Sequence, residues 1–226
     1  YYIFENGKLK IKCYYNLTLD YKEMSFDEAV SKIENEVEES VKYHKISDVE
    51  VGSFLSGGVD SSYVVATAMP NKTFSVGFDN KGFNETVYAK ELSDRLGIEN
   101  FSKIITPDEF FDGINKVQYF SDEPHANLSS VALYFLSKLA SEQVKVVLSG
   151  EGADELFAGY NEYAEALPQR IYKKLPFCLR NKLYKKLKDK RHFSGKTIVM
   201  KYGQKVEDRY IGPAEIMSDE QANLIL

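Results

Sequence analysis

Apolar and polar residues alternate with two different periods along the chain, and each period predicts one kind of element. Over residues 1–15, two strand-like segments flank Asn6 and Gly7, the strongest two-residue signal for a hairpin turn. Ser25 then begins a capping-box pattern, and apolar residues recur at helical spacing over 26–43. The first part of the chain therefore predicts a β-hairpin followed by one amphipathic helix.

From about residue 48, short apolar runs alternate with helical patterns. The runs predict strands at 49–55, 72–78, 100–105 and 144–148. The segments between them predict helices at 60–69, 84–96, 107–119 and 130–142. Such alternation is typical of a parallel sheet with helices on both faces, so we expect an α/β, Rossmann-like three-layer fold. After Gly159 the strand pattern stops, and 160–226 predicts a helical C-terminal part.

Length and composition indicate the size of the domain and argue against one class of function. The chain has 226 residues, of which 43% are apolar, so it can form one large α/β domain with a sizeable core. A net charge of −5 argues against a general nucleic-acid binder. A lysine-rich stretch at 182–191 shares its helical pattern with leucines at 179, 183 and 187, which is typical of a solvated helix face.

Cysteine content and hydropathy bear on the compartment. Cys13 and Cys178 are far apart and lack the spacing of metal ligands, as expected of thiols in a reducing compartment. The sequence has no apolar run of membrane-spanning length and no signal-peptide pattern. We therefore expect a cytoplasmic protein. The start at Tyr1 and a helical pattern that runs to the last residue suggest a piece of a longer protein.

The most informative stretch is SGGVDSS at residues 56–62, between a predicted strand and a predicted helix. Glycines let backbone N–H groups approach a phosphate, and the start of the helix adds a positive dipole end. The serine hydroxyls are further donors, and Asp60 could hold a magnesium ion. The stretch has no lysine, so it is not the phosphate loop of kinases and GTPases. The plain alternative is a serine- and glycine-rich turn that binds nothing.

A second glycine-rich stretch, SGEGADELFAGY at residues 149–160, also follows a predicted strand. Because the carboxyl ends of parallel strands meet at one edge of a sheet, the two loops should face each other. Asp60 and Asp154 could then share a hard cation, and Glu151 could act as a general base. Alternatively, Asp154 and Glu155 only stabilise the positive end of a helix.

The loop at 56–62 resembles the pyrophosphate loop of the ATP pyrophosphatases, and further motifs narrow the family. They are 75–79, Asn84-Glu85-Thr86 with Ala89, 122–124, and 149–160. Together they resemble the C-terminal synthetase domain of glutamine-dependent asparagine synthetase, over residues 15 to 160. The resemblance implies a fold of the adenine nucleotide α-hydrolase type.

The resemblance implies a carbon–nitrogen ligase that joins ammonia to aspartate. The aspartate carboxylate attacks ATP to give β-aspartyl-AMP and pyrophosphate, and ammonia from glutamine then displaces AMP. The implied pyrophosphate-binding residues are Ser56, Gly57, Gly58, Asp60, Ser61 and Ser62. The implied lining of the adenosine pocket is Leu55, Val76, Ser149 and Gly150. Asp60 and Asp154 would bind Mg²⁺, and Glu151 would act in amide formation.

The resemblance also implies a division of the chain. Residues 1–20 would be the tail of, or connection from, a missing N-terminal glutaminase domain. Residues 21–160 would be the ATP-binding core, and 161–226 a truncated helical part. The family also uses a downstream lysine that nothing after Tyr160 matches, so we expect the chain alone to turn over little. For the full-length protein we expect a glutaminase domain and a homodimer.

The acceptor is less well defined by the sequence than the nucleotide. Residues 122–130 lie where the family shapes its amino-acid pocket, and Asp122, Glu123 and His125 are candidates for contact with aspartate. A related amidotransferase, a β-lactam-forming enzyme or a tRNA-modifying ligase would share the nucleotide motifs. A relative that senses nucleotides without catalysis is a further alternative.

Overall fold

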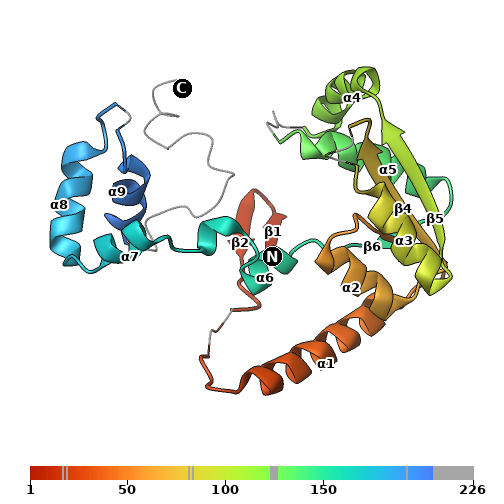
Figure 1. The fold of residues 1–226 in the computed structure, drawn as a ribbon, viewed down its shortest axis with the longest axis horizontal. Helices are drawn as coiled ribbons and strands as arrows, with labels where there is room; N and C mark the ends of the chain where they lie inside the picture. Colours follow the sequence, from red (N-terminus) through yellow and green to blue (C-terminus); the bar gives the residue numbers. More distant parts are fainter. Residues whose placement is uncertain are drawn as a thin grey trace. The chain divides into compact units, whose positions relative to one another are not determined.

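The computed structural model describes residues 1–16, 18, 20–80, 82, 84–122, 127–191 and 193–205 (Figure 1). The chain divides into two compact units, Tyr1–Gly150 and Glu151–Leu226. The expected boundaries near residues 20 and 160 stay predictions.

The first unit begins with the predicted hairpin, β1 (Tyr2–Glu5) and β2 (Lys8–Ile11), which pair antiparallel. Asn6 and Gly7 both have positive φ, as a two-residue hairpin turn requires. Helix α1 (Phe26–His44) follows, and the predicted capping box is present: Ser25 accepts from the Glu28 amide while the Glu28 side chain accepts from the Ser25 amide.

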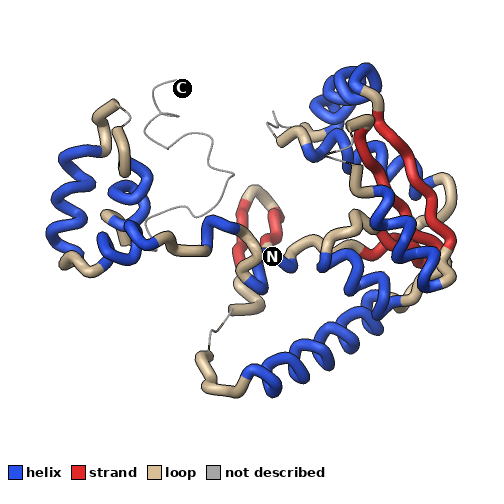
Figure 2. The backbone as a smooth tube through the Cα atoms, in the orientation of Figure 1, coloured by secondary structure: helices blue, strands red, loops and turns tan. Residues whose placement is uncertain are grey.

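A four-stranded parallel sheet forms the centre of the first unit (Figure 2). Its strands are β3 (Val51–Phe54), β4 (Lys72–Phe78), β5 (Glu99–Ile105) and β6 (Val146–Leu148), in the order β5-β4-β3-β6. The chain therefore builds outward from β3 through β4 to β5 and then returns to add β6 on the other side of β3. The carboxyl ends of β3 and β6 flank the point where the order reverses, which is where open α/β sheets bind ligands.

Helices cover both faces of this sheet, as the sequence predicts. They are α2 (Val59–Ala68), α3 (Thr86–Leu96), α4 (Pro107–Phe120) and α5 (Ser129–Ser141). Adjacent residues of a strand point to opposite faces. Thr73 bonds to Ser93 of α3, whereas its neighbour Phe74 packs with Ala140 and Val144 at the end of α5. The α/β fold with helices on both faces is thus confirmed.

Two strands are shorter than the sequence predicts. The run at 144–148 begins as a strand only at Val146, because the amides of Gln143 and Val144 still donate to Ala140 at the end of α5. The run at 49–55 is a strand only over Val51–Phe54, although the Leu55 amide still donates to the carbonyl of Phe74 at 2.9 Å.

The described part of the second unit is helical. Its helices are α6 (Ala153–Phe157), a 3₁₀ turn (Asn161–Tyr163), α7 (Leu167–Lys173), α8 (Phe177–Leu187) and α9 (Lys196–Tyr202). Arg180 of α8 donates to the carbonyl of Tyr202 at 2.6 Å, and Asn181 donates to that of Gly203 at 2.9 Å. These bonds tie α8 to the end of α9. Lys182, Lys185 and Lys186 are exposed, as a solvated face requires. Across the described ranges, no helix is long and apolar enough to cross a bilayer.

Replacement of Phe74 tests the core of the sheet. Phe74 is 0% exposed, and Phe74→Ala should lower the free energy of unfolding by about 3–5 kcal/mol, since it leaves a cavity. Phe111→Ala is the control, because Phe111 is 68% exposed and its loss should change stability by only about 0.5 kcal/mol. Urea denaturation followed by circular dichroism measures both, and similar losses would contradict this placement of the core.

Candidate nucleotide site

The loop at 56–62 leaves the end of β3 and is closed by bonds between its own residues. The Ser56 amide donates to the Ser61 hydroxyl at 3.2 Å, and the two serine hydroxyls lie 3.0 Å apart. The Gly58 amide donates to the Ser56 hydroxyl at 3.2 Å. A short loop of this kind gathers amides and hydroxyls at the start of α2, which is a favourable place for an anion. Asp60 lies in the first turn of α2 and is exposed.

Gly57 makes the sharpest turn of this loop, against the start of α3. Its φ is +87°, a conformation that favours glycine. A Cβ at this position would lie 2.8 Å from the Cβ of Tyr88 and 3.3 Å from the carbonyl oxygen of Glu85. The loop can therefore lie against α3 only with glycine here. Sequence reasoning assigned no role to Tyr88, because its contact with the loop spans about thirty residues of sequence and follows from no local pattern.

The second glycine loop meets the first at Gly150. A Cβ on Gly150 would lie 2.9 Å from the amide nitrogen of Ser61 and 3.1 Å from the carbonyl carbon of Asp60. Gly150 therefore packs against the backbone at the start of α2. Ser149, just before it, follows the last residue of β6 and is exposed. The expectation that the two loops approach each other holds for this part of the second loop.

Of the predicted lining of an adenosine pocket, the Leu55 side chain is buried in the core and the Val76 side chain is half-buried. Leu55 packs with Val65, Ala89 and Ile98, and Val76 packs against the cluster formed by α4 and α5. A ligand would therefore meet the backbone of Leu55 and not its side chain. The β3–β4 pairing ends at Phe54 and Phe74, so β4 continues beyond β3. The backbone carbonyl of Phe74 points towards β3, because it accepts from the Leu55 amide. Backbone groups alternate sides along a strand, so the N–H and C=O of Val76, two residues later, point to the same side.

The remaining predicted catalytic and metal-binding residues begin the second unit. Glu151 is exposed, and Asp154 lies in the first turn of α6. The Asp154 carboxylate lies against Gly159, and the Gly159 amide donates to the Asp154 carbonyl at 3.0 Å. Because Asp60 belongs to the other unit, a metal site shared by Asp60 and Asp154 stays a prediction. In the described ranges, no group of three or more His, Cys, Asp or Glu residues is arranged to hold a metal.

Tyr160 and Glu155 form a charge-assisted hydrogen bond at the end of the second loop. The Tyr160 hydroxyl donates to Glu155 at 2.6 Å. This bond raises the pKa of Tyr160 to about 12 and lowers the pKa of Glu155 below its usual value, since it favours the protonated phenol and the charged carboxylate.

Of the residues predicted to contact aspartate, the structure describes only Asp122. Asp122 is exposed and has a φ of +59°. Glu123 and His125 lie outside the described residues. Their roles and that of Asp122 stay predictions.

Comparison with known proteins identifies the family. The Asparagine synthase family model matches residues 32–223. The chain belongs to the asparagine synthase family. Over 98% of its length it is 39% identical to "Asparagine synthetase [glutamine-hydrolyzing] 1" of Bacillus subtilis, of which it covers 36%. Over 93% of its length it is 36% identical to the putative asparagine synthetase [glutamine-hydrolyzing] of Mycobacterium tuberculosis, of which it covers 32%. The chain thus spans about a third of the length of these relatives.

Matches among solved structures have lower sequence identity to this chain. The NMN synthetase of Francisella tularensis has a TM-score of 0.39 and 20% identity, covering 63% of this chain and 61% of the other. The glutamine-dependent NAD⁺ synthetase of Acinetobacter baumannii, solved with ADP, has a TM-score of 0.38 and 17% identity, covering 82% and 45%.

A pair of glycine substitutions tests the geometry of the first loop. Gly57→Ala should lower the free energy of unfolding by about 2–4 kcal/mol, because it combines an unfavourable φ with a clash against Tyr88. Gly58→Ala is the matched control: Gly58 has a φ of −72°, and its Cβ would meet only the Ser56 hydroxyl, at 3.3 Å. That change should cost about 1 kcal/mol or less. Equal losses in urea denaturation would refute the close approach of Gly57 to α3.

The hydrogen bond between Tyr160 and Glu155 should make the stability of the protein depend on pH. Tyr160→Phe should destabilise the protein at neutral pH, and this difference should disappear as pH rises from about 10 towards 12, because the folded-state pKa of Tyr160 is raised from 10 to about 12. The difference should also shrink as pH falls below 4.5, through the lowered folded-state pKa of Glu155. The phenolate absorbance of wild type minus that of Tyr160→Phe measures the titration directly. A midpoint near 10 would show that the bond does not form.

Proposed function

We propose that the chain is the ATP-binding part of a cytoplasmic asparagine synthetase, a carbon–nitrogen ligase. It uses ATP to convert the side-chain carboxylate of aspartate to β-aspartyl-AMP with release of pyrophosphate, and ammonia then displaces AMP to give asparagine. The observation that carries the proposal is the packing of Gly150 against the backbone of Asp60 and Ser61, because it joins two glycine loops at the edge of the sheet where ligands bind. The family of the chain supports the choice of reaction.

The first loop would hold the pyrophosphate part of ATP. Ser56, Ser61 and Gly58 supply the hydroxyls and amide that now bond to one another, and the same donors could turn to phosphate oxygens. The ten-residue helix α2 begins at this loop, and its positive end favours an anion. Ser62 and Gly57 complete the set, the latter by allowing the turn. These donors would stabilise the charge that builds up as the α-phosphorus is attacked.

The adenosine part would lie beside the end of β4. The backbone of Val76 faces the side on which β3 has ended, where its N–H and C=O could bond to the edge of the adenine base. The buried Leu55 directly follows β3 and the exposed Ser149 directly follows β6, and Gly150 leaves space that a side chain would fill. Recognition of the base would thus depend on backbone groups.

The donor chemistry at the loops fits Mg²⁺, which prefers carboxylate and phosphate oxygens. Asp60 is exposed at the head of α2, and Asp154 lies at the head of α6, so either carboxylate could bind a hydrated ion. Bound there, Mg²⁺ would neutralise charge on the departing pyrophosphate. Glu151 would take a proton from the incoming ammonia or its adduct. The relatives are named as glutamine-hydrolysing enzymes, and we propose that a glutaminase domain of the same protein supplies the ammonia.

Titration with Mg·ATP tests the nucleotide site. Asp60→Asn should weaken Mg·ATP binding by about tenfold or more, since it removes a charged ligand at the phosphates. Asp94→Asn is the matched control, because Asp94 is an exposed carboxylate on α3 that pairs with Lys90. It makes the same change of charge and should leave the affinity within about twofold. Isothermal calorimetry measures both variants, and equal affinities for the two would refute the role of Asp60.

The reaction is tested on the full-length gene product. Pyrophosphate exchange into ATP should depend on aspartate when a panel of amino acids and other carboxylates is supplied. Exchange that depends on another carboxylate would show a related ligase with a different acceptor. Binding of Mg·ATP without exchange for any acceptor would show a nucleotide-binding protein that does not catalyse adenylation.

A further inference from the structure

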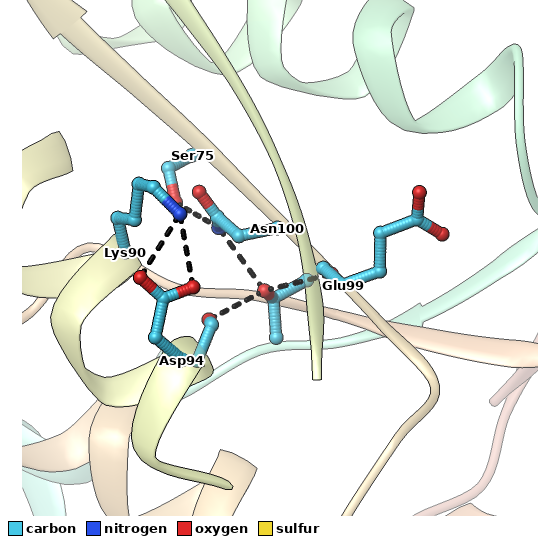
Figure 3. Close-up of polar contacts among 7 residues, drawn as sticks. Ser75, Lys90, Asp94, Glu99 and Asn100 are labelled. Atoms are coloured by element: carbon cyan, nitrogen blue, oxygen red, sulfur yellow. Dashed lines mark hydrogen bonds and ion pairs between the residues drawn. The ribbon is translucent and has the colours of Figure 1, made fainter. Parts of the chain in front are cut away.

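Polar side chains of β4, β5 and α3 bond to one another on the face of the sheet that packs against α2 and α3, and Figure 3 labels two of them, Ser75 and Asn100. We call this set the seam; its members are Thr73, Ser75, Ser93 and Asn100. On β4, Thr73 and Ser75 are fully buried, and so is Ser93 on α3. Asn100 of β5 donates from the same Nδ2 atom to the Thr73 hydroxyl at 3.0 Å and to the Ser75 hydroxyl at 3.1 Å. The Thr73 and Ser93 hydroxyls lie 2.9 Å apart. The seam thus joins three hydroxyls and one amide under α3.

The seam ends at the residue that precedes the first glycine loop. The Ser75 hydroxyl donates to the carbonyl of Leu55 at 2.8 Å, and this oxygen belongs to the Leu55–Ser56 peptide. A peptide unit is planar, so the direction of this carbonyl also sets the direction of the Ser56 N–H. That N–H is one of the donors inside the loop, since it bonds to the Ser61 hydroxyl. A side chain of β4 therefore orients the first amide of the loop.

Asn100 fixes the direction of the Ser75 hydroxyl in turn. The Asn100 amide donates to Ser75, which leaves the Ser75 proton for Leu55. The Oδ1 atom of Asn100 is buried and has no hydrogen-bond partner among the described residues. An unsatisfied buried acceptor costs free energy, and a replacement by an apolar residue would avoid that cost. Asn100 thus directs the Ser75 hydroxyl while its own Oδ1 atom lacks a partner among the described residues.

The second glycine loop has a similar arrangement on the neighbouring strand. Ser53 of β3 is fully buried, and its hydroxyl donates to the carbonyl of Leu148 at 3.3 Å and to that of Phe54 at 3.2 Å. Leu148 ends β6 directly before Ser149 and Gly150. A serine one strand away thus contacts the residue before each glycine loop.

We propose that Ser75, directed by Asn100, is a positioning residue for the nucleotide loop: it holds the Leu55–Ser56 peptide so that the Ser56 N–H faces the pyrophosphate. Its effect on ligand affinity rests on the proposed function, whereas its effect on the loop itself does not. Ser75 acts through the loop backbone and is not assigned any contact with ATP.

The test compares Ser75→Ala with Ser93→Ala. Each change removes one fully buried hydroxyl from the seam, but only Ser75 bonds to the loop. In the protein without nucleotide, Ser75→Ala should speed hydrogen exchange at the Ser56 amide by about tenfold, since the peptide loses its fixed direction. In the full-length gene product, it should also weaken Mg·ATP binding by about fivefold to tenfold. Ser93→Ala should lower stability while leaving both quantities within about twofold of wild type.

The two readouts separate the proposals. Faster exchange at Ser56 in Ser75→Ala, with no Mg·ATP binding by wild type, would support the positioning role and refute the proposed function. Unchanged exchange and affinity in Ser75→Ala, or equal effects in Ser93→Ala, would refute the positioning role. If Ser75→Ala does not fold, Asn100→Ala is the second variant, because it removes the amide that directs the Ser75 hydroxyl. It also removes the unsatisfied Oδ1 atom, which should limit the loss of stability. It should speed exchange at Ser56 by about threefold or more, and wild-type exchange would overturn the proposal.

Discussion

The pairing of β3 with a strand on each side is the constraint on which the site depends. β4 pairs with one edge of β3 and β6 with the other, although Val51 and Val146, which face each other, are far apart in the sequence. Both glycine loops leave the same edge of the sheet only because these two strands are parallel neighbours. The β3–β6 pairing brings Gly150 to the start of α2. Without it, nothing in the described part of the first unit would hold the two loops together.

Two kinds of contact hold the glycine loops against the sheet: close backbone approach at glycines, and hydrogen bonds from buried hydroxyls. Gly57 and Gly150 act by what they lack, since each lets one backbone lie where a Cβ would collide with another part of the chain. Ser75 and Ser53 each donate a hydroxyl hydrogen bond to the carbonyl of the residue that directly precedes a glycine loop. A loop held in this way needs little ordering when an anion arrives, which lowers the entropic cost of binding.

The sequence was sufficient for the hairpin, the parallel sheet with its alternating helices, and the positions of both glycine loops, because these follow from local periodicity and turn chemistry. It did not reveal the polar seam. Thr73 to Val76 alternates polar and apolar residues, a pattern that usually indicates one solvent-exposed face. Here the polar side chains Thr73 and Ser75 are buried under α3, where Asn100 and Ser93 satisfy them. Such pairing across strands is set by tertiary packing, so no window along one segment could show it. The family relation, by contrast, was visible in the motifs alone.

The late position of β6 in the chain has a consequence for folding. Ser53 and Leu148 are 95 residues apart in sequence, so their strands pair only after a long loop has closed. Strands β3, β4 and β5 are joined by shorter connections, and we expect them to associate earlier because contacts of lower sequence separation form faster. An intermediate with these three strands would expose one edge of β3 and carry only the first glycine loop. Under the proposed function, nucleotide would bind weakly to such an intermediate and would stabilise the completed sheet, which would favour the final folding step.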